Sequence, residues 1–440
     1  MHCIPYIPRL LAFLPCIGST LSLCALLPKC LVFLYICNPI MLPISNRGSL
    51  MPESPIRKLA PLAEAAKQKG LTVYHLNIGQ PDIATPQAMI DAVKENISPI
   101  IEYSHSAGNE SYRHKLVSYY AKHAINIQHS DIIVTTGASE AILFSFLGCL
   151  DVGDEVIIPE PFYANYHAFA IVAGIKVIPV SSAITDGFSL PALAEIEAKI
   201  TDRTKAILIC NPNNPTGYLY SEQELKQLEN LVIKYNLYLF ADEAYREFCY
   251  GGKHYSALQF EHASQHVILV DSISKRYSAC GLRLGAIVTK NKLVINTIMK
   301  FAQARLSPPY YAQVAAEAAI DLPDDYFTVT KTEYNKRRDI LVKRLNGMKD
   351  VFCPNPGGSF YAMAKLPIDN CDTFCTWLLN DFSYNNTTIM LAPGTGFYET
   401  KGMGLQEVRF AYVLNTESIN AAMDCLEEAL KVYPGNVNNI

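Results

Sequence analysis

A lysine with hydroxyl and guanidinium neighbours is the first feature of the sequence that could do chemistry. In the segment VDSISKRYSACGLRLG, a strand-like run ends at Val270, and Ser272, Ser274, Lys275 and Arg283 follow it. A guanidinium binds phosphate through paired hydrogen bonds and hydroxyl groups donate to its oxygens, so this spacing favours a phosphate site. A lysine amine beside such a site suggests an aldehyde cofactor that carries a phosphate and is held as a Schiff base. A lone lysine after a strand would instead be a solvated surface charge.

A glycine turn supplies a second candidate contact to an anion. In TTGASEAILFSFLGCL, a strand-like run leads into Gly137, and a helix is expected to begin near Ala138 and Ser139. The first turn of a helix presents free backbone N–H groups and the positive end of the helix dipole, which together bind anions. A glycine before a helix is more often only a turn. Together with the segment around Lys275, however, it predicts the second half of a phosphate cup.

Two further polar segments follow strand-like runs. In FADEAY, Asp242 comes directly after an apolar run and Tyr245 lies three residues later. A carboxylate that faces a pyridine nitrogen keeps the nitrogen protonated and makes the ring an electron sink, and a phenol nearby can donate to the ring oxygen. A capping aspartate and a packed tyrosine are the simpler interpretation. In NPNNPTG, Asn214 lies in a predicted turn and could donate a hydrogen bond inside the same pocket.

The elements that must position these residues are short β-rich runs that alternate with helical patterns. The runs are Ile132–Thr135, Glu155–Ile158, Lys176–Val180, Ala206–Cys210, Tyr238–Ala241, Val267–Val270 and Ala286–Thr289. Ser221 and Glu224 form a capping-box pattern at the start of a helix predicted over Ser221–Tyr235. This alternation predicts an α/β fold with a mostly parallel sheet covered on both faces, and ligands bind beyond the carboxyl ends of such strands.

The chain divides by composition into four expected parts. Residues 1–40 are apolar, with charges only at Arg9 and Lys29, and contain an uncharged run from Leu10 to Leu27. This segment could precede a true translation start at Met41 or Met51, could target or anchor the protein in a membrane, or could be folded structure. We expect residues 41–84 to begin a smaller domain, 85–330 to form the large domain, and 331–440 to complete the smaller one, opening with a helix over Lys331–Leu345.

The motifs NPNNPTG, DEAY, SxSKxxxxxGxRxG and the late VRFAY resemble those of class I/II aminotransferases of fold type I. More narrowly, they are similar to the branch that includes many bacterial aspartate and aromatic aminotransferases. The resemblance covers about Ile44 to Tyr433, with the motifs in the family's order and spacing. It implies a mostly parallel seven-stranded sheet flanked by helices, a smaller α+β domain, and the cofactor pyridoxal 5'-phosphate.

The resemblance also implies a role for each matching position. Lys275 would hold the cofactor as a Schiff base and catalyse proton transfer, Asp242 would pair with the pyridine nitrogen, and Tyr245 and Asn214 would bind the ring's phenolic oxygen. Tyr163 would stack on the ring. The phosphate would be bound by Ala138 through its backbone and by Ser139, Ser272, Ser274 and Arg283. Arg409 would bind the substrate α-carboxylate with Gly79 beside it, and Tyr103 would reach the phosphate of a neighbouring subunit, which implies a homodimer.

The implied activity is transamination between an L-amino acid and a 2-oxo acid by ping-pong kinetics, with no metal. An aspartate-like donor or a broad range is favoured. Arg305 could bind a distal carboxylate or be a solvated helix charge, and Tyr310 and Tyr311 would suit an aromatic side chain. Alternatives on the same scaffold are C–S β-elimination and decarboxylation, and a further one is a ligand sensor without catalysis. A sensor for transcription would need a basic DNA-binding module, which the apolar N-terminal segment does not provide.

Composition narrows the class of protein. The 440 residues are 50% hydrophobic and 18% charged with a net charge of −4, which argues against extended disorder and nucleic-acid binding. Five of the 13 cysteines fall in the first 37 residues, and no CxxC pair occurs. The others lie mostly in apolar runs, which is typical of buried reduced thiols in a cytoplasmic protein. Membrane association depends only on residues 1–40.

Overall fold

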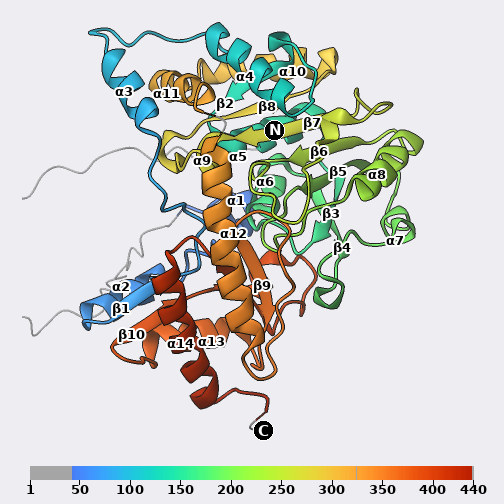
Figure 1. The fold of residues 1–440 in the computed structure, drawn as a ribbon. Coiled ribbons are helices and arrows are strands. Elements are labelled where there is room, and N and C mark those ends of the chain that lie inside the picture. The colour runs from blue at the N-terminus through green and yellow to red at the C-terminus, as the bar shows by residue number, and fades with distance from the viewer. Residues whose placement is uncertain (1–41, 324, 439–440) are drawn as a thin grey trace, which may run out of the picture. The chain divides into compact units, whose positions relative to one another are not determined.

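The seven β-rich runs form one sheet in the computed structural model, which describes residues 42–323 and 325–438 (Figure 1). The strands are β2 Ile132–Thr135, β3 Glu155–Glu160, β4 Lys176–Ser181, β5 Thr204–Cys210, β6 Tyr238–Asp242, β7 Val267–Ser272 and β8 Gly285–Val288. Their order is β2-β8-β7-β6-β5-β3-β4, and neighbours are parallel except where β8 pairs with β2 and β7. The predicted mostly parallel seven-stranded sheet is therefore confirmed.

Helices cover both faces of this sheet, and each face has its own apolar core. Successive strand residues point to opposite faces, so Phe240 of β6 joins one buried cluster, whereas Leu239 and Ala241 join the other. The first cluster includes side chains of α5 Gly137–Cys149, α6 Asn165–Ala173 and α10 Lys292–Arg305. The second includes side chains of α3 Gln87–Glu95, α4 Glu110–Lys122, α8 Glu222–Lys234 and α11 Tyr310–Ile320. Strands buried on both faces are apolar throughout, which explains the continuous hydrophobic runs of the sequence.

The predicted helix start at Ser221 is confirmed. The Glu224 backbone N–H donates to the Ser221 hydroxyl at 3.2 Å, and the Ser221 N–H donates back to the Glu224 carboxylate at 2.7 Å. The predicted helix over Lys331–Leu345 belongs to the longer α12, Asp325–Asn346. The remaining helices are the short α1 Asn46–Leu50, α7 Leu193–Glu197 and α9 Ile273–Arg276, and α2 Ala60–Gln68, α13 Cys371–Asn380 and α14 Thr416–Val432.

Two smaller sheets lie outside the large one, and the first of them joins the beginning of the described chain to its later part. Strand β1 Thr72–His75 pairs in parallel with β10 Thr387–Met390. Strand β12 Glu407–Ala411 lies between β11 Ala392–Pro393 and β9 Tyr361–Lys365 in an antiparallel sheet. The chain from Asn46 onward forms one compact unit. The predicted boundaries of the large and small domains, at 84/85 and 330/331, stay a prediction.

The apolar segment of residues 1–40 lies outside the described residues, so its three alternatives stay open. Within the described part of the chain, no helix is long and apolar enough to cross a bilayer.

Candidate active site

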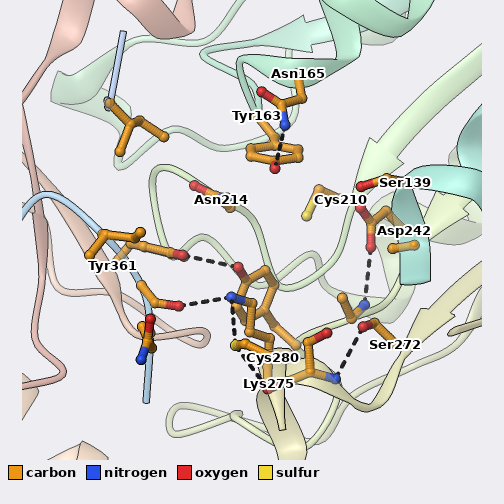
Figure 2. A pocket seen from close by; sticks show the side chains of 18 of the residues that line it. Ser139, Tyr163, Asn165, Cys210, Asn214, Asp242, Ser272, Lys275, Cys280 and Tyr361 are labelled. Atoms are coloured by element: carbon orange, nitrogen blue, oxygen red, sulfur yellow. Dashed lines mark hydrogen bonds between the residues drawn. The ribbon is translucent and has the colours of Figure 1, made fainter. Parts of the chain in front are cut away.

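A cavity of ≈ 660 Å³ lies where the predicted chemical residues converge, beyond the carboxyl ends of β5, β6 and β7 (Figure 2). Segments from distant parts of the sequence line it. The predicted site residues that line it are Gly79, Ala138, Ser139, Tyr163, Asn214, Asp242, Tyr245, Ser272, Ser274, Lys275, Arg283 and Arg409. Of the residues that the resemblance assigns to the cofactor and the α-carboxylate, only Tyr103 does not line it.

Lys275 lies on the single turn α9, directly after β7. The Ser272 hydroxyl caps this turn by accepting a hydrogen bond from the Ser274 N–H at 3.1 Å. The half-buried Lys275 Nζ donates to the Gly79 carbonyl at 2.8 Å and lies 3.6 Å from the Cys280 sulfur. The amine is therefore directed into the cavity and held by neutral acceptors, with no carboxylate pair among the described residues.

The two halves of the expected anion site meet beside Lys275. Helix α5 begins at Gly137, whose φ is +74°, and Arg283 lies opposite with φ +52°. A Cβ added to Gly137 would lie 2.7 Å from an Arg283 guanidinium nitrogen, and one added to Gly285 would lie 2.8 Å from the Ala138 nitrogen. A side chain at either glycine would therefore collide with groups that form the cup. Amides, hydroxyls and a guanidinium are the donors that a phosphate requires.

Asp242 is a buried carboxylate at the end of β6. It accepts hydrogen bonds from the Tyr166 hydroxyl at 2.8 Å and from the Ala244 N–H at 3.1 Å. Burial raises the pKa of Asp242 to about 6, and those hydrogen bonds offset only part of the rise. None of the described cations pairs with it. A protonated ring nitrogen would supply the missing counter-charge, so this carboxylate fits a pyridoxal ring.

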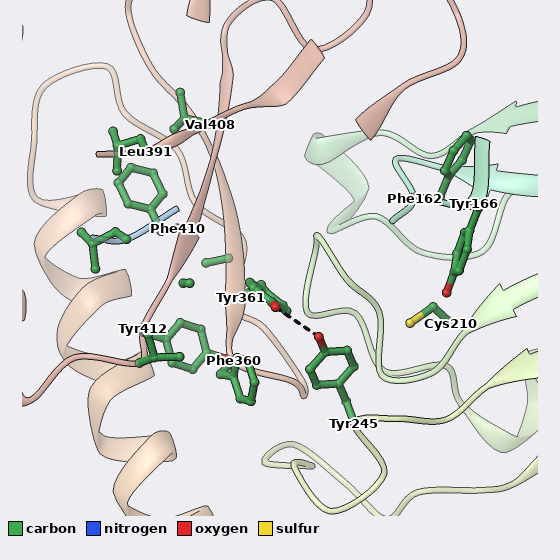
Figure 3. Packing of buried hydrophobic residues seen from close by; sticks show 14 of the residues in the cluster. Phe162, Tyr166, Cys210, Tyr245, Phe360, Tyr361, Leu391, Val408, Phe410 and Tyr412 are labelled. Carbon is green, nitrogen blue, oxygen red and sulfur yellow. Dashed lines mark hydrogen bonds between the residues drawn. The ribbon is translucent and has the colours of Figure 1, made fainter. Parts of the chain in front are cut away.

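Tyr245 and Tyr361 close one wall of the cavity. Their hydroxyls are 3.1 Å apart, and both rings pack against aromatic side chains around Phe360 (Figure 3). Burial raises the pKa of Tyr245 well above its ordinary value, so the phenol stays a hydrogen-bond donor. A Cβ on Gly79 would lie 1.8 Å from the Tyr361 hydroxyl, so the wall requires glycine at that position.

Arg409 is a buried guanidinium on β12, only 1% exposed. It donates to the Asn214 side-chain oxygen at 2.8 Å and to the Asn77 carbonyl at 2.5 Å, while its Nε has no partner among the described residues. Burial lowers its pKa, because no carboxylate compensates the charge. A buried cation with neutral partners on one side and a cavity on the other fits a carboxylate ligand.

The other candidates for substrate contact lie elsewhere. Tyr103 is 80% exposed and does not line the cavity. Arg305 forms an ion pair with Glu140 at 2.8 Å and donates to the Ser106 carbonyl, so the structure places it outside the cavity. Tyr310 and Tyr311 lie on α11 and do not line the cavity either.

Sequence reasoning missed several residues that line the cavity. They are Ser54, Ile56, Arg57, Ile78, Gln80, Ile142, Asn165, Tyr166, Cys210, Ala244, Cys280, Gly281 and Tyr361. Cys280 lies inside the segment VDSISKRYSACGLRLG and Tyr166 lies three residues after Tyr163, so their neighbours could have pointed to them. Arg57 and Tyr361 lie in segments without any motif.

One group of potential metal ligands occurs in the described residues, at the surface. Glu110, His114 and His129 have ligand atoms within 4.8 Å of one another, and none of them lines the cavity. The expectation that the reaction needs no metal stays a prediction.

Comparison with known proteins identifies the family. Residues 72–425 match the family model for aminotransferase class I and II. The chain belongs to this family. It is 32% identical to an aspartate aminotransferase of Pyrococcus horikoshii over 88% of this chain and 97% of that one. It also superposes on an aspartate aminotransferase of Thermus thermophilus with maleate, with TM-score 0.81 and 26% identity over 88% of this chain and all of the other. An alanine aminotransferase of Pyrococcus furiosus gives TM-score 0.81 and 31% identity over the same shares.

The aminotransferase has the fold type I architecture and uses pyridoxal 5'-phosphate for transamination. Elimination, decarboxylation and a sensor role are not favoured, because the relatives of this aminotransferase are themselves named as aminotransferases. The expectations of family, fold, cofactor and reaction are thereby confirmed.

Proposed function

We propose that the cavity binds pyridoxal phosphate in one orientation, fixed at its two ends. Arg283, Ser272, Ser274, Ser139 and the Ala138 amide would bind the phosphate, as the tight approach of Gly137 to Arg283 supports. At the other end, Asp242 would pair with the ring nitrogen. The unpaired buried carboxylate is the single observation that carries this proposal, because no described cation explains it. Tyr163 would stack on the ring face, and Tyr245 and Asn214 would bind the ring oxygen.

When bound, the cofactor supplies an electron-withdrawing ring that makes the substrate Cα–H acidic. The chain's own residues then orient the substrate and move a proton. Arg409 would hold the α-carboxylate bidentately, which fixes the direction of the Cα–H bond, and Asn214 would hold the guanidinium in place. Lys275 Nζ would take the proton from the substrate Cα and deliver it to the C4′ carbon of the cofactor. The Lys275 amine contacts a carbonyl and a sulfur and no carboxylate, so no ion pair would have to break when the amine takes up or releases a proton.

The amino donor that we propose is aspartate. This rests on the names of the relatives, because the Pyrococcus horikoshii and Thermus thermophilus proteins are aspartate aminotransferases. The Pyrococcus furiosus protein is an alanine aminotransferase, which makes alanine the natural comparison substrate.

We further propose a homodimer in which Tyr103 contributes to the partner's phosphate site. Tyr103 lies in an exposed stretch with Ile97, Ile100 and Ile101, which are 61–70% exposed. A contiguous exposed apolar segment of this kind is typical of a protein interface. A reducing compartment such as the cytoplasm is also proposed, because the cysteines of the described chain are free thiols, most of them buried.

An absorbance spectrum of the purified full chain with added pyridoxal phosphate, before and after L-aspartate, tests the proposal. A visible band that shifts to the spectrum of the amine form of the cofactor would support the cofactor, the half-reaction and the donor together. A band that responds to alanine but ignores aspartate would refute the donor. No band at all would refute the role of Lys275. The variant Tyr103→Phe tests the shared site. If Tyr103 contributes to the partner's phosphate site, the variant should lose the cofactor more readily than the wild type when both are diluted.

A further inference from the structure

One cation that lines the cavity has no role in the proposed chemistry. Of the described residues that line it, Arg57, Lys275, Arg283 and Arg409 are basic, and Asp242 is the acidic one. The other three basic groups each have a hydrogen bond in the site and a proposed ligand. Arg57 is exposed at the cavity wall, and its side chain makes no hydrogen bond or ion pair with any described residue.

The next residue shows what an ordinary surface cation does in this turn. Lys58 forms an ion pair with Asp372 at 2.5 Å, and Lys58 does not line the cavity. Two adjacent basic residues therefore differ in their surroundings: Lys58 pairs with an acidic side chain outside the cavity, whereas Arg57 lines the cavity without an acidic partner among the described residues.

The turn that carries Arg57 is tied to the carboxylate site. The Asn77 side chain donates to the Ile56 carbonyl at 3.1 Å, and the Asn77 carbonyl accepts from Arg409 at 2.5 Å. Pro55 packs so closely on Gly396 that a Cβ there would lie 2.2 Å from the proline Cβ. The position of Arg57 relative to Arg409 is therefore set by direct contacts and not by a free loop.

Charge balance then indicates the class of substrate. With Arg283 facing a phosphate, Arg409 facing an α-carboxylate and Asp242 facing a ring nitrogen, the Arg57 charge alone is unmatched. A neutral amino acid would leave the Arg57 charge without a partner, whereas a substrate with a second carboxylate would pair with it. A guanidinium can bind a carboxylate through two hydrogen bonds, which also fixes the orientation of the carboxylate. We propose that Arg57 binds the side-chain carboxylate of a dicarboxylic amino acid and sets the preference for acidic over neutral donors. This rests on the proposed function of the cavity.

Binding of unreactive acids to the full-length holoenzyme tests the assignment without turnover. Succinate and butyrate differ by one carboxylate, and both lack the amino group needed for reaction. In Arg57→Met, we expect the Kd for succinate to rise about 10- to 100-fold while that for butyrate stays within about twofold, because a charge-assisted pair is lost only for the diacid. Arg57→Lys should keep part of the preference, since the charge remains but the bidentate geometry does not.

Lys58→Met is the matched control, because it removes the same charge one residue away and should leave both Kd values unchanged. The assignment is overturned if Arg57→Met weakens succinate and butyrate equally, if Lys58→Met has the same effect, or if the wild type binds both acids alike. In kinetics, Arg57→Met should lower kcat/KM for aspartate about 10- to 100-fold relative to alanine. Failure of the proposed function is distinguishable, because the wild type would then show no spectral change with aspartate or alanine.

Discussion

Replacing Asp242 with asparagine should stabilise the cofactor-free protein while it disables the enzyme. Asp242 is fully buried, and burial raises its pKa from an ordinary value of 3.8 to about 6. A rise of that size means that the charged form costs about 3 kcal/mol of folding stability. Asparagine has no charge and its side-chain oxygen can still accept from Tyr166 or Ala244. Because its amide N–H groups need acceptors of their own, we expect a net gain of about 1–2 kcal/mol.

The sign of the pH dependence follows from the raised pKa. As pH rises from about 4 to about 6, the unfolded chain ionises Asp242 while the folded chain keeps the proton, so the wild type loses stability in that window and does not regain it above. The advantage of Asp242→Asn should therefore be absent at pH 4 and complete at pH 8. This difference in stability is measured from the unfolding midpoints in urea of the two cofactor-free proteins at both pH values.

Asp271 provides the matched control, because it is also fully buried but is paired. Burial would raise its pKa, but Arg276 and Arg246 outweigh burial and hold the pKa at about 2. Its stabilising contribution is present above pH 4 and is lost as pH falls towards 2. Asp271→Asn should therefore destabilise the protein at pH 8 by about 3–5 kcal/mol, since it leaves buried guanidinium groups without their partner. If both asparagine variants destabilise the cofactor-free protein at pH 8, the electrostatic reasoning about Asp242 is wrong. Added pyridoxal phosphate should reverse the order of stability, so that the wild type with cofactor is more stable than Asp242→Asn with cofactor.

Three further variants test other parts of the site. Lys275→Ala should abolish transamination and leave the circular dichroism spectrum unchanged; a variant with substantial turnover would contradict the role of the amine. Gly79→Ala should lower kcat/KM by about 10-fold or more because its Cβ would collide with the Tyr361 hydroxyl, and unchanged kinetics would show that this wall yields easily. Arg305→Met should lower the melting temperature by leaving the half-buried Glu140 unpaired, without changing the ratio of aspartate to alanine turnover. A change in that ratio would show that Arg305 does affect substrate binding.

The predictable part of the structure is the part encoded locally. The apolar runs predict all seven strands, and most of the cavity residues follow these runs, because parallel strands present their carboxyl ends at one edge of the sheet. The α8 start was found from a capping box that involves residues three positions apart. These signals lie within a few residues of one another, so a single sequence contains them.

The unpredicted part depends on contacts between distant segments. Tyr361 reaches Tyr245 across 116 positions, and Arg305 reaches Glu140 across 165. The charge on Arg305 looks the same in the sequence whether it pairs with Glu140, faces solvent or binds substrate. Arg57 enters the cavity wall through a turn that no motif marks. The packing of Pro55 on Gly396 and the hydrogen bond from Asn77 help to place that turn, and neither has a sequence pattern.

A network of buried ion pairs lies next to the cavity. Its members are adjacent in sequence to residues that line the cavity. Glu243, Arg246, Asp271 and Arg276 directly follow or precede Asp242, Tyr245, Ser272 and Lys275, respectively. Arg246 pairs with Glu243 at 2.9 Å and lies 3.8 Å from Asp271, which pairs with Arg276 at 2.9 Å.

This arrangement follows from the local geometry of the backbone. Where β6 and β7 end, adjacent residues of the extended chain point to opposite sides, so one side chain of each polar pair lies in the cup and the other in the ion-pair network. The two arginines of the network follow in the turns after these strands. Buried ion pairs contribute little net free energy to folding, but breaking one is costly. They therefore restrict the conformations of the two turns that they join. The network therefore holds the turn that carries Lys275 next to the strand that carries Asp242, so residues that do not line the cavity help to set the distance between the amine and the carboxylate.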